Sequence, residues 1–133
     1  MIYFDANVFI YANLDAGRTG EWCRELLRRV ASGREEGLTS ALTIDEVVYQ
    51  VREDRGLDAS LEAGRGLLEM AHLTIAPADV EVLWRSLDLS GRTGLFPRDA
   101  IHAATALLRD ATEIYSEDAD FDAVDGLTRR WMR

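Results

Sequence analysis

The chain has 133 residues, the length of one domain, and its 47% apolar and 29% charged residues are typical of a folded soluble protein rather than a disordered one. Its apolar stretches are only a few residues long, which excludes a segment of the roughly 20 residues needed to cross a bilayer. Twenty-four acids oppose fifteen arginines with no lysine, and the net charge of −9 excludes binding of a polyanion by bulk attraction.

The N-terminal residues and the cysteine content bear on location. The chain begins without a basic region and reaches Asp5 within its first residues, unlike a secretory signal. Cys23 is the single cysteine, so it cannot form an internal disulfide and lacks a ligand set for zinc. We therefore expect a cytoplasmic protein with no membrane partner, in which Cys23 is a small buried residue.

Strands and helices alternate along the chain. The short aromatic and β-branched run at 2–4 predicts a buried strand, and the apolar residues of 21–31 recur on one face of a helix. We predict strands at 2–4, 37–40, 73–76 and 112–116, with a fifth candidate at 127–131, and helices at 8–14, 21–31, 42–52, 57–71, 77–89 and 97–108. This order predicts a three-layer α/β/α fold with a central parallel sheet of four to five strands.

Four acids occupy equivalent places in this scheme. Asp5 ends the first strand, Glu46 lies in the helix after the second, and Asp99 and Asp118 flank the fourth. Each has a purely structural alternative. Asp5 could cap a helix, Glu46 could form a capping box with Thr43, Asp99 could favour a helix dipole, and Asp118 could cap or turn.

Taken together, the four acids point to a metal site. Sites in parallel sheets form beyond the carboxyl ends of the strands, so the four carboxylates should converge on one rim. Unpaired carboxylates within a few ångströms of one another repel and raise each other's pKa. A hard divalent cation, Mg²⁺ or Mn²⁺, would hold them together, polarise a phosphodiester and activate water, with no nucleophilic side chain required.

Four segments, in this order and spacing, resemble the motifs of the PIN-domain family, and most closely those of VapC-like toxins of VapBC toxin–antitoxin pairs. They are Asp5-Ala6-Asn7, Thr39-Ser40 with Thr43 and Asp45-Glu46-Val47, Pro97-Arg98-Asp99-Ala100-Ile101-His102-Ala103-Ala104, and Ser116 with Asp118, Asp120 and Phe121. The resemblance covers nearly the whole chain and implies a single PIN domain over residues 1–133.

The resemblance also implies roles for individual residues. It assigns catalysis and metal binding to Asp5, Glu46, Asp99 and Asp118. Asn7 and Ser116 match polar positions that orient the first aspartate or its water, and Asp120 is an additional outer acid. Asp45 should point about 100° away from its neighbour Glu46 and not act as a ligand.

Other polar residues near these motifs have less defined expectations. Arg98 can contact a phosphate because guanidinium pairs bidentately with it. For His102 we favour a packed or supporting imidazole over a general acid. Arg129, Arg130 and Arg133 form a basic cluster that could bind RNA, although a solvated face is the simpler reading.

The function implied is endonucleolytic hydrolysis of RNA with Mg²⁺ or Mn²⁺. The resemblance further implies a homodimer and a VapB-like antitoxin whose C-terminal segment enters the acidic cleft. Two alternatives stay open: a PIN nuclease of RNA processing without an antitoxin, and a non-catalytic module that holds a metal. The sequence opposes two other aspartate-based classes, since receiver domains need a lysine and haloacid-dehalogenase-like phosphatases have a second Asp where Asn7 stands.

Overall fold

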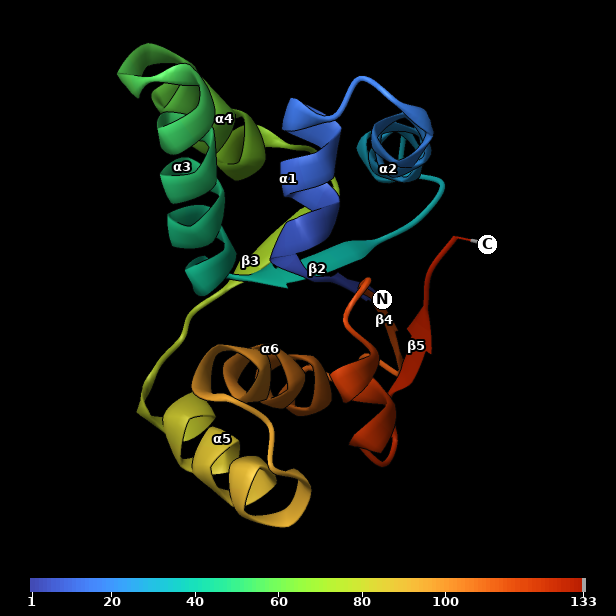
Figure 1. The fold of residues 1–133 in the computed structure, drawn as a ribbon. Coiled ribbons are helices and arrows are strands. Elements are labelled where there is room, and N and C mark those ends of the chain that lie inside the picture. The colour runs from blue at the N-terminus through green and yellow to red at the C-terminus, as the bar shows by residue number, and fades with distance from the viewer. Residues whose placement is uncertain (133) are drawn as a thin grey trace.

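A five-stranded sheet runs through the middle of the computed structural model, which describes residues 1–132 (Figure 1). From edge to edge the strands are β3 (Leu73–Ala76), β2 (Gly37–Ser40), β1 (Ile2–Phe4), β4 (Glu113–Tyr115) and β5 (Thr128–Arg130). Every neighbouring pair is parallel. The first strand of the chain therefore lies at the centre, between β2 and β4, and carries Asp5 directly after it.

Helices cover both faces of the sheet. Helices α1 (Ala6–Leu14), α2 (Arg18–Ala31), α3 (Ala41–Arg55) and α4 (Leu57–Glu69) lie on one face, and α5 (Val80–Thr93) and α6 (Pro97–Leu108) on the other (Figure 1). A short 3₁₀ helix, η1 (Ala119–Ala123), connects β4 to β5. The predicted three-layer fold with a parallel sheet is confirmed.

The central strand is buried on both faces, as expected in a parallel sheet. Successive side chains of a strand point to opposite faces. Accordingly, Tyr3 packs into the core under α5 and α6, whereas Phe4 packs into the core under α1–α4. Cys23 is fully buried in the second core, as the sequence predicts. No helix within residues 1–132 combines the length and apolarity that crossing a membrane requires.

Several helices begin or end at residues other than those predicted. The helix predicted to start at Pro77 begins instead at Val80, because the Asp79 side chain accepts a hydrogen bond from the backbone N–H of Val82 (3.2 Å). It continues past residue 89 to Thr93 and is followed by Gly94, whose φ of 78° suits a helix terminus. Helix α1 begins two residues earlier than predicted because Asp5 caps it, and η1 was not predicted.

Candidate active site

The site lies at the carboxyl ends of the three central strands. Asp5 follows β1, and its backbone N–H donates to the carbonyl of Tyr115, the last residue of β4 (3.0 Å). Ser116 follows β4, and Glu46 lies in α3, which begins directly after β2. The parallel sheet therefore brings side chains from distant parts of the sequence to one rim, as the sequence predicts.

Asp5 combines a capping role with a place in the site. Its Oδ1 accepts a hydrogen bond from the backbone N–H of Ala6 (2.8 Å) and lies 3.5 Å from Nε2 of His102. Its Oδ2 accepts a hydrogen bond from the Ser116 hydroxyl (2.7 Å). The carboxylate is buried and both oxygens are contacted, so its orientation is fixed by neighbours in α1, in α6 and in the segment after β4.

Ser116 connects three parts of the rim. Its hydroxyl donates to Asp5 and accepts hydrogen bonds from the backbone N–H of Asp118 (3.0 Å) and from Nδ2 of Asn7 (3.4 Å). These contacts use the one donor and both lone pairs of the hydroxyl. The amide oxygen of Asn7 is buried and has no hydrogen-bond partner within the described part of the chain. A buried acceptor without a partner is a place for a water or another ligand.

Glu46 is held by a buried histidine. His102 Nε2 lies 2.6 Å from Glu46 Oε1, and His102 Nδ1 lies 2.6 Å from the hydroxyl of Tyr3. Burial opposes the charged imidazolium, but the hydrogen bond to Glu46 and the charges of Asp5 and Glu46 outweigh it and raise the pKa of His102. The Glu46 carboxylate can only accept, so Nε2 carries the hydrogen of this bond, whereas the Tyr3 hydroxyl can donate to Nδ1 or accept from it.

Three aspartates form the tightest acidic group in the part of the chain that the structure describes. One carboxylate oxygen from each of Asp99, Asp118 and Asp120 lies within 4.8 Å of the others. Asp118 also caps η1, accepting a hydrogen bond from the backbone N–H of Asp120 (2.9 Å). Burial, the hydrogen bond with Asp118 and the charges of Asp118 and Asp5 raise the pKa of Asp99 to about 7.

The predicted acids therefore fall into two adjoining groups. Asp5 and Glu46 meet at His102, whereas Asp99 and Asp118 meet together with Asp120, which the sequence ranked as an outer acid. The charge of Asp5 acts on Asp99, so the two groups belong to one electrostatic site. Tyr3 was missed, although side chains two residues apart on a strand share a face and Tyr3 precedes Asp5 by two.

The capping-box interpretation of Thr43 and Glu46 is wrong. Helix α3 is capped by Ser40, whose hydroxyl accepts from the backbone N–H of Leu42 (3.0 Å), and Ser40 lies six residues before Glu46. Thr43 instead shares a buried hydrogen bond with Thr39 (2.7 Å). The capping interpretations of Asp5 and Asp118 hold, and both residues nevertheless face the acidic rim.

The arginines have different surroundings. Arg129 pairs with Asp122, and Arg130 pairs with Glu113, so both are engaged by acids; Arg133 lies outside the described residues. Arg98 is exposed and lines a pocket next to Glu46. Arg98, which the sequence predicts to contact a phosphate, therefore lies beside the acids of the rim.

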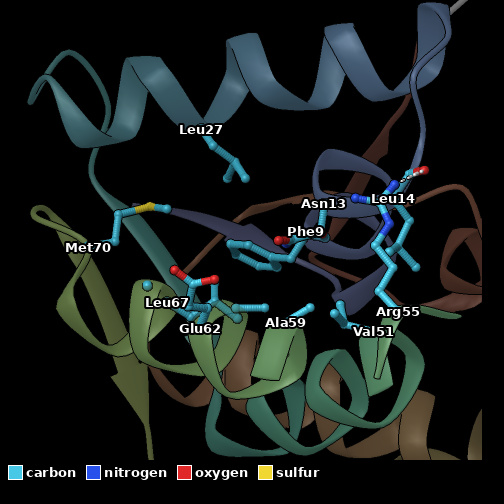
Figure 2. A pocket seen from close by; sticks show the side chains of 12 residues that line it. Phe9, Asn13, Leu14, Leu27, Val51, Arg55, Ala59, Glu62, Leu67 and Met70 are labelled. Atoms are coloured by element: carbon cyan, nitrogen blue, oxygen red, sulfur yellow. Dashed lines mark hydrogen bonds between the residues drawn. The ribbon is translucent and has the colours of Figure 1, made fainter. Parts of the chain in front are cut away.

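A separate cavity of about 400 Å³ lies between α1, α2, α3 and α4 (Figure 2). Figure 2 shows the ring of Phe9 near its middle, with Leu27 above and Leu67, Ala59 and Val51 below. Its charged lining residues are Arg55 and Glu62, and none of the rim acids lines it. This cavity is not part of the candidate active site.

Comparisons with known proteins place this geometry in a family. The model of the family described as PIN domain matches residues 2–127. No curated protein sequence matches the chain. Among solved structures, a toxin–antitoxin complex from Klebsiella pneumoniae is 22% identical with a TM-score of 0.70, covering 96% of each chain.

Two further structures are similar over almost the full length. The chain of VapBC2 from Rickettsia felis, crystallised with promoter DNA, is 18% identical with a TM-score of 0.75, and 98% of each chain is covered. VapC20 from Mycobacterium tuberculosis, described as a toxin that cleaves the sarcin–ricin loop, is 16% identical with a TM-score of 0.76, covering 92% of this chain and 94% of that one. At these identities the likeness concerns the fold. With the family model matched across nearly all of its length, the chain belongs to the PIN-domain family.

Proposed function

We propose that this protein is a metal-dependent endoribonuclease that hydrolyses RNA phosphodiester bonds with Mg²⁺ or Mn²⁺, acting in the cytoplasm as the toxin of a toxin–antitoxin pair. The observation that carries the proposal is the meeting of Asp99, Asp118 and Asp120 within 4.8 Å, beside Asp5 and Glu46. So many carboxylates repel one another unless protons or cations compensate them. Burial, the hydrogen bond with Asp118 and the charges of Asp118 and Asp5 together raise the pKa of Asp99, so part of the rise comes from this repulsion.

The residues fit a hard divalent cation. Such cations take oxygen ligands and retain several waters. Asp99, Asp118 and Asp120 would hold the cation, with Asp5 and Glu46 as the adjoining carboxylates. The unpartnered amide oxygen of Asn7 is an acceptor for a water at the same rim.

The chain's own side chains supply orientation. A bound cation would polarise the phosphodiester and activate water as the nucleophile. Ser116 holds Asp5, and His102 holds Oε1 of Glu46. Within residues 1–132, Oε2 of Glu46 has no hydrogen-bond partner, so it can accept a proton from the attacking water.

A cleavage assay tests the proposed activity. Purified protein incubated with total RNA and Mn²⁺ should give discrete new 5′ ends, and EDTA should abolish them. Asp99→Asn and Asp5→Asn should each lower the rate at least about a hundredfold, the effect expected for removing a group that acts on the reaction. The exposed Asp88→Asn serves as a matched control with unchanged rate. Equal cleavage by Asp99→Asn, or cleavage in EDTA, would refute the proposal.

The assay also separates the alternatives. Mn²⁺ binding without cleavage of any RNA would favour a non-catalytic metal-holding module. Cleavage by a protein whose gene has no short neighbouring reading frame would favour an RNA-processing nuclease. A VapB-like antitoxin is proposed because the similar structures from Klebsiella pneumoniae and Rickettsia felis are a toxin–antitoxin complex and VapBC2.

The acidic rim suggests how such a partner would bind. An arginine from the antitoxin would satisfy unpaired carboxylates in a chain with a net charge of −9. Co-expression of the neighbouring gene product should yield a complex without nuclease activity. High salt should dissociate it and release Mn²⁺-dependent cleavage, because screening weakens ion pairs at an accessible rim. A complex that is fully active before dissociation would contradict this arrangement.

We also propose that the protein is a homodimer. Val80, Leu83, Trp84 and Leu87 recur at i, i+3, i+4 and i+7 on α5 and are all exposed. A contiguous apolar stripe of this kind is typical of an interface.

A further inference from the structure

A pocket of about 370 Å³ adjoins the acidic rim, between α3, α1 and the start of α6. Its lining residues are Ile10, Asp45, Glu46, Tyr49, Gln50 and Arg98. Glu46 belongs both to this pocket and to the acidic site, where it accepts the hydrogen bond from His102. A group bound in the pocket would therefore lie next to the carboxylates that act on the phosphodiester.

Tyr49 presents an aromatic surface in this pocket. It lies on α3 and is 61% exposed, an unusual position for a large ring. Asp45 lies one turn earlier on the same face of the helix, and Gln50 follows Glu46 by the same spacing. The helix thus offers a ring, a carboxylate and an amide side by side.

Arg98 stands across the pocket, as the second residue of α6. Among the ion pairs formed by residues 1–132, none involves Arg98 or Asp45. Both charged groups are exposed and available to a ligand. Elsewhere on the surface several arginines are paired with acids, as Arg28 is with Glu25.

The chemistry of the pocket favours a nucleobase over a phosphate. Two carboxylates, Asp45 and Glu46, would repel a phosphate inside the pocket, and the single guanidinium lies at its edge. An unstacked base is neutral and stacks on aromatic rings or guanidinium planes. Carboxylates accept hydrogen bonds from the amino groups of bases. Guanine offers two adjacent donors to a carboxylate, whereas uracil offers one donor between two carbonyl oxygens that a carboxylate repels.

From this geometry we infer that the pocket binds one unstacked base of the RNA substrate, guanine in preference to uracil, beside the phosphate to be cleaved. Tyr49 stacks on the base, Asp45 accepts from its Watson–Crick edge, and Arg98 contacts the adjoining phosphate. The inference rests on the proposed ribonuclease function, and it adds the recognition element that selects the cleavage position.

Binding experiments with cleavage suppressed test the pocket directly. Short single-stranded RNAs that contain one guanosine in a uridine background, and all-uridine RNAs of equal length, are titrated by fluorescence anisotropy with Ca²⁺ replacing Mn²⁺. Tyr49→Ala should weaken binding of the guanosine RNA about tenfold, consistent with loss of one base–aromatic stack. Tyr49→Trp should restore it. Leu68→Ala, an exposed apolar residue on α4, is the matched control.

Two further variants separate recognition of the base edge by Asp45 from attraction of the phosphate by Arg98. Asp45→Asn should reduce the preference for guanosine over uridine at least about fivefold, because an amide presents one acceptor oxygen to the base edge where a carboxylate presents two. Arg98→Ala should lower the affinity for both RNAs equally and make that affinity depend less on salt concentration. The exposed Arg65→Ala on α4 controls for loss of one positive charge.

Cleavage by the same variants, measured as kcat/KM with Mn²⁺, distinguishes this inference from the proposed function. If the wild type cleaves RNA and the variants Tyr49→Ala and Asp45→Asn keep its preference for guanosine, the pocket does not bind the base. The inference is then overturned, and the proposed nuclease function stands. Guanosine-selective binding that depends on Tyr49, without any cleavage, would support the pocket and refute the nuclease. A change of oligomeric state in Tyr49→Ala would reassign the residue to an interface between copies and overturn the inference.

Discussion

His102 and Glu46 form a hydrogen bond of 2.6 Å at the floor of the acidic rim, and the imidazole is only 1% exposed. The two residues are separated by 56 positions in the sequence. Tyr3 occupies the other ring nitrogen, so the imidazole cannot rotate away from Glu46 without losing a buried hydrogen bond. The pair leaves Glu46 with one oxygen fixed and one available, an arrangement typical of carboxylates oriented by a neighbour for metal binding.

Tyr3→Phe tests this orientation. Loss of the hydroxyl leaves Nδ1 without its partner and removes one of the two hydrogen bonds that fix the imidazole, so the ring holds Glu46 less firmly. We expect Mn²⁺ affinity, measured by isothermal titration calorimetry, to fall about tenfold, the lower end of the effect of supporting residues. His72→Asn, which alters the chain's other histidine at an exposed position, is the control. Unchanged affinity in a Tyr3→Phe protein with native circular dichroism would contradict the role.

Because the pKa of Asp99 is raised, the stability of the protein without a bound cation should fall as pH rises. The pKa is about 7 in the folded protein and near its ordinary value of 3.8 in the unfolded chain. Between these values the folded state keeps a proton that the unfolded state releases, so stability falls as pH rises through this window and then levels off. Asp99→Asn removes this dependence.

Thermal unfolding in EDTA measures the effect. At pH 8 Asp99→Asn should be more stable than wild type by about 1 kcal/mol, a value that allows for screening of a half-buried group. This corresponds to a rise in Tm of about 4 °C for a domain of this size. At pH 4 the two proteins should unfold together, and Asp88→Asn should match wild type at both pH values. A Tm of Asp99→Asn below wild type at pH 8 would count against the crowding of the acids.

Added Mn²⁺ should make the wild type more stable than Asp99→Asn at pH 8. A cation bound to the folded state alone raises its stability by mass action, and protons compete with it for Asp99. Differential scanning fluorimetry should show a larger Mn²⁺-induced rise in Tm for wild type at pH 8 than at pH 5.5. Asp99→Asn and Asp118→Asn should lose most of this rise. An equal rise in these variants would place the cation elsewhere on the molecule.

The sheet and the rim could be predicted because they follow local rules. Strands β1 and β4 are directly followed by Asp5 and Ser116 of the rim, and a parallel sheet aligns those positions without any detailed knowledge of side-chain packing. The predicted starts of α3 and α5 differ from the observed ones by one and three residues because Ser40 and Asp79 were not identified as caps from the sequence. Asp5 was considered as a cap, but the helix was still predicted to begin two residues after the observed start of α1.

The finer arrangement of the site depends on contacts across the sequence. Tyr3 and His102 are 99 positions apart, and the sequence pattern around neither residue indicates that the two side chains meet. Asp120 joins Asp99 because the 3₁₀ helix η1 redirects the chain after Asp118, and a five-residue turn of this kind leaves little pattern in the sequence.

Ser116→Ala should loosen the rim without removing a carboxylate. The substitution removes the donor to Oδ2 of Asp5 and leaves the backbone N–H of Asp118 without its acceptor. We expect a loss of about 1–2 kcal/mol in the free energy of unfolding, measured in urea, because buried polar groups lose their partners. The cleavage rate should fall about tenfold as Asp5 gains freedom.

Ser60→Ala is the matched control for this change. Ser60 is also buried and donates to a backbone carbonyl, that of Leu57, but lies in α4 away from the acids. It should lose comparable stability with no loss of cleavage rate. A Ser116→Ala protein that keeps the wild-type rate would show that Asp5 does not need this hydrogen bond.

The exposed stripe of α5 gives the test of self-association. Trp84 is 69% exposed at the centre of the stripe, between Leu83 and Leu87. Tryptophan at the centre of an interface contributes much of the binding free energy, and a charge placed there is left without a partner. The wild type should therefore elute as a dimer in size-exclusion chromatography with light scattering, and Trp84→Arg as a monomer with native circular dichroism. Leu68→Arg on α4 should remain dimeric. A monomeric wild type, or a dimeric Trp84→Arg protein, would exclude α5 as the interface.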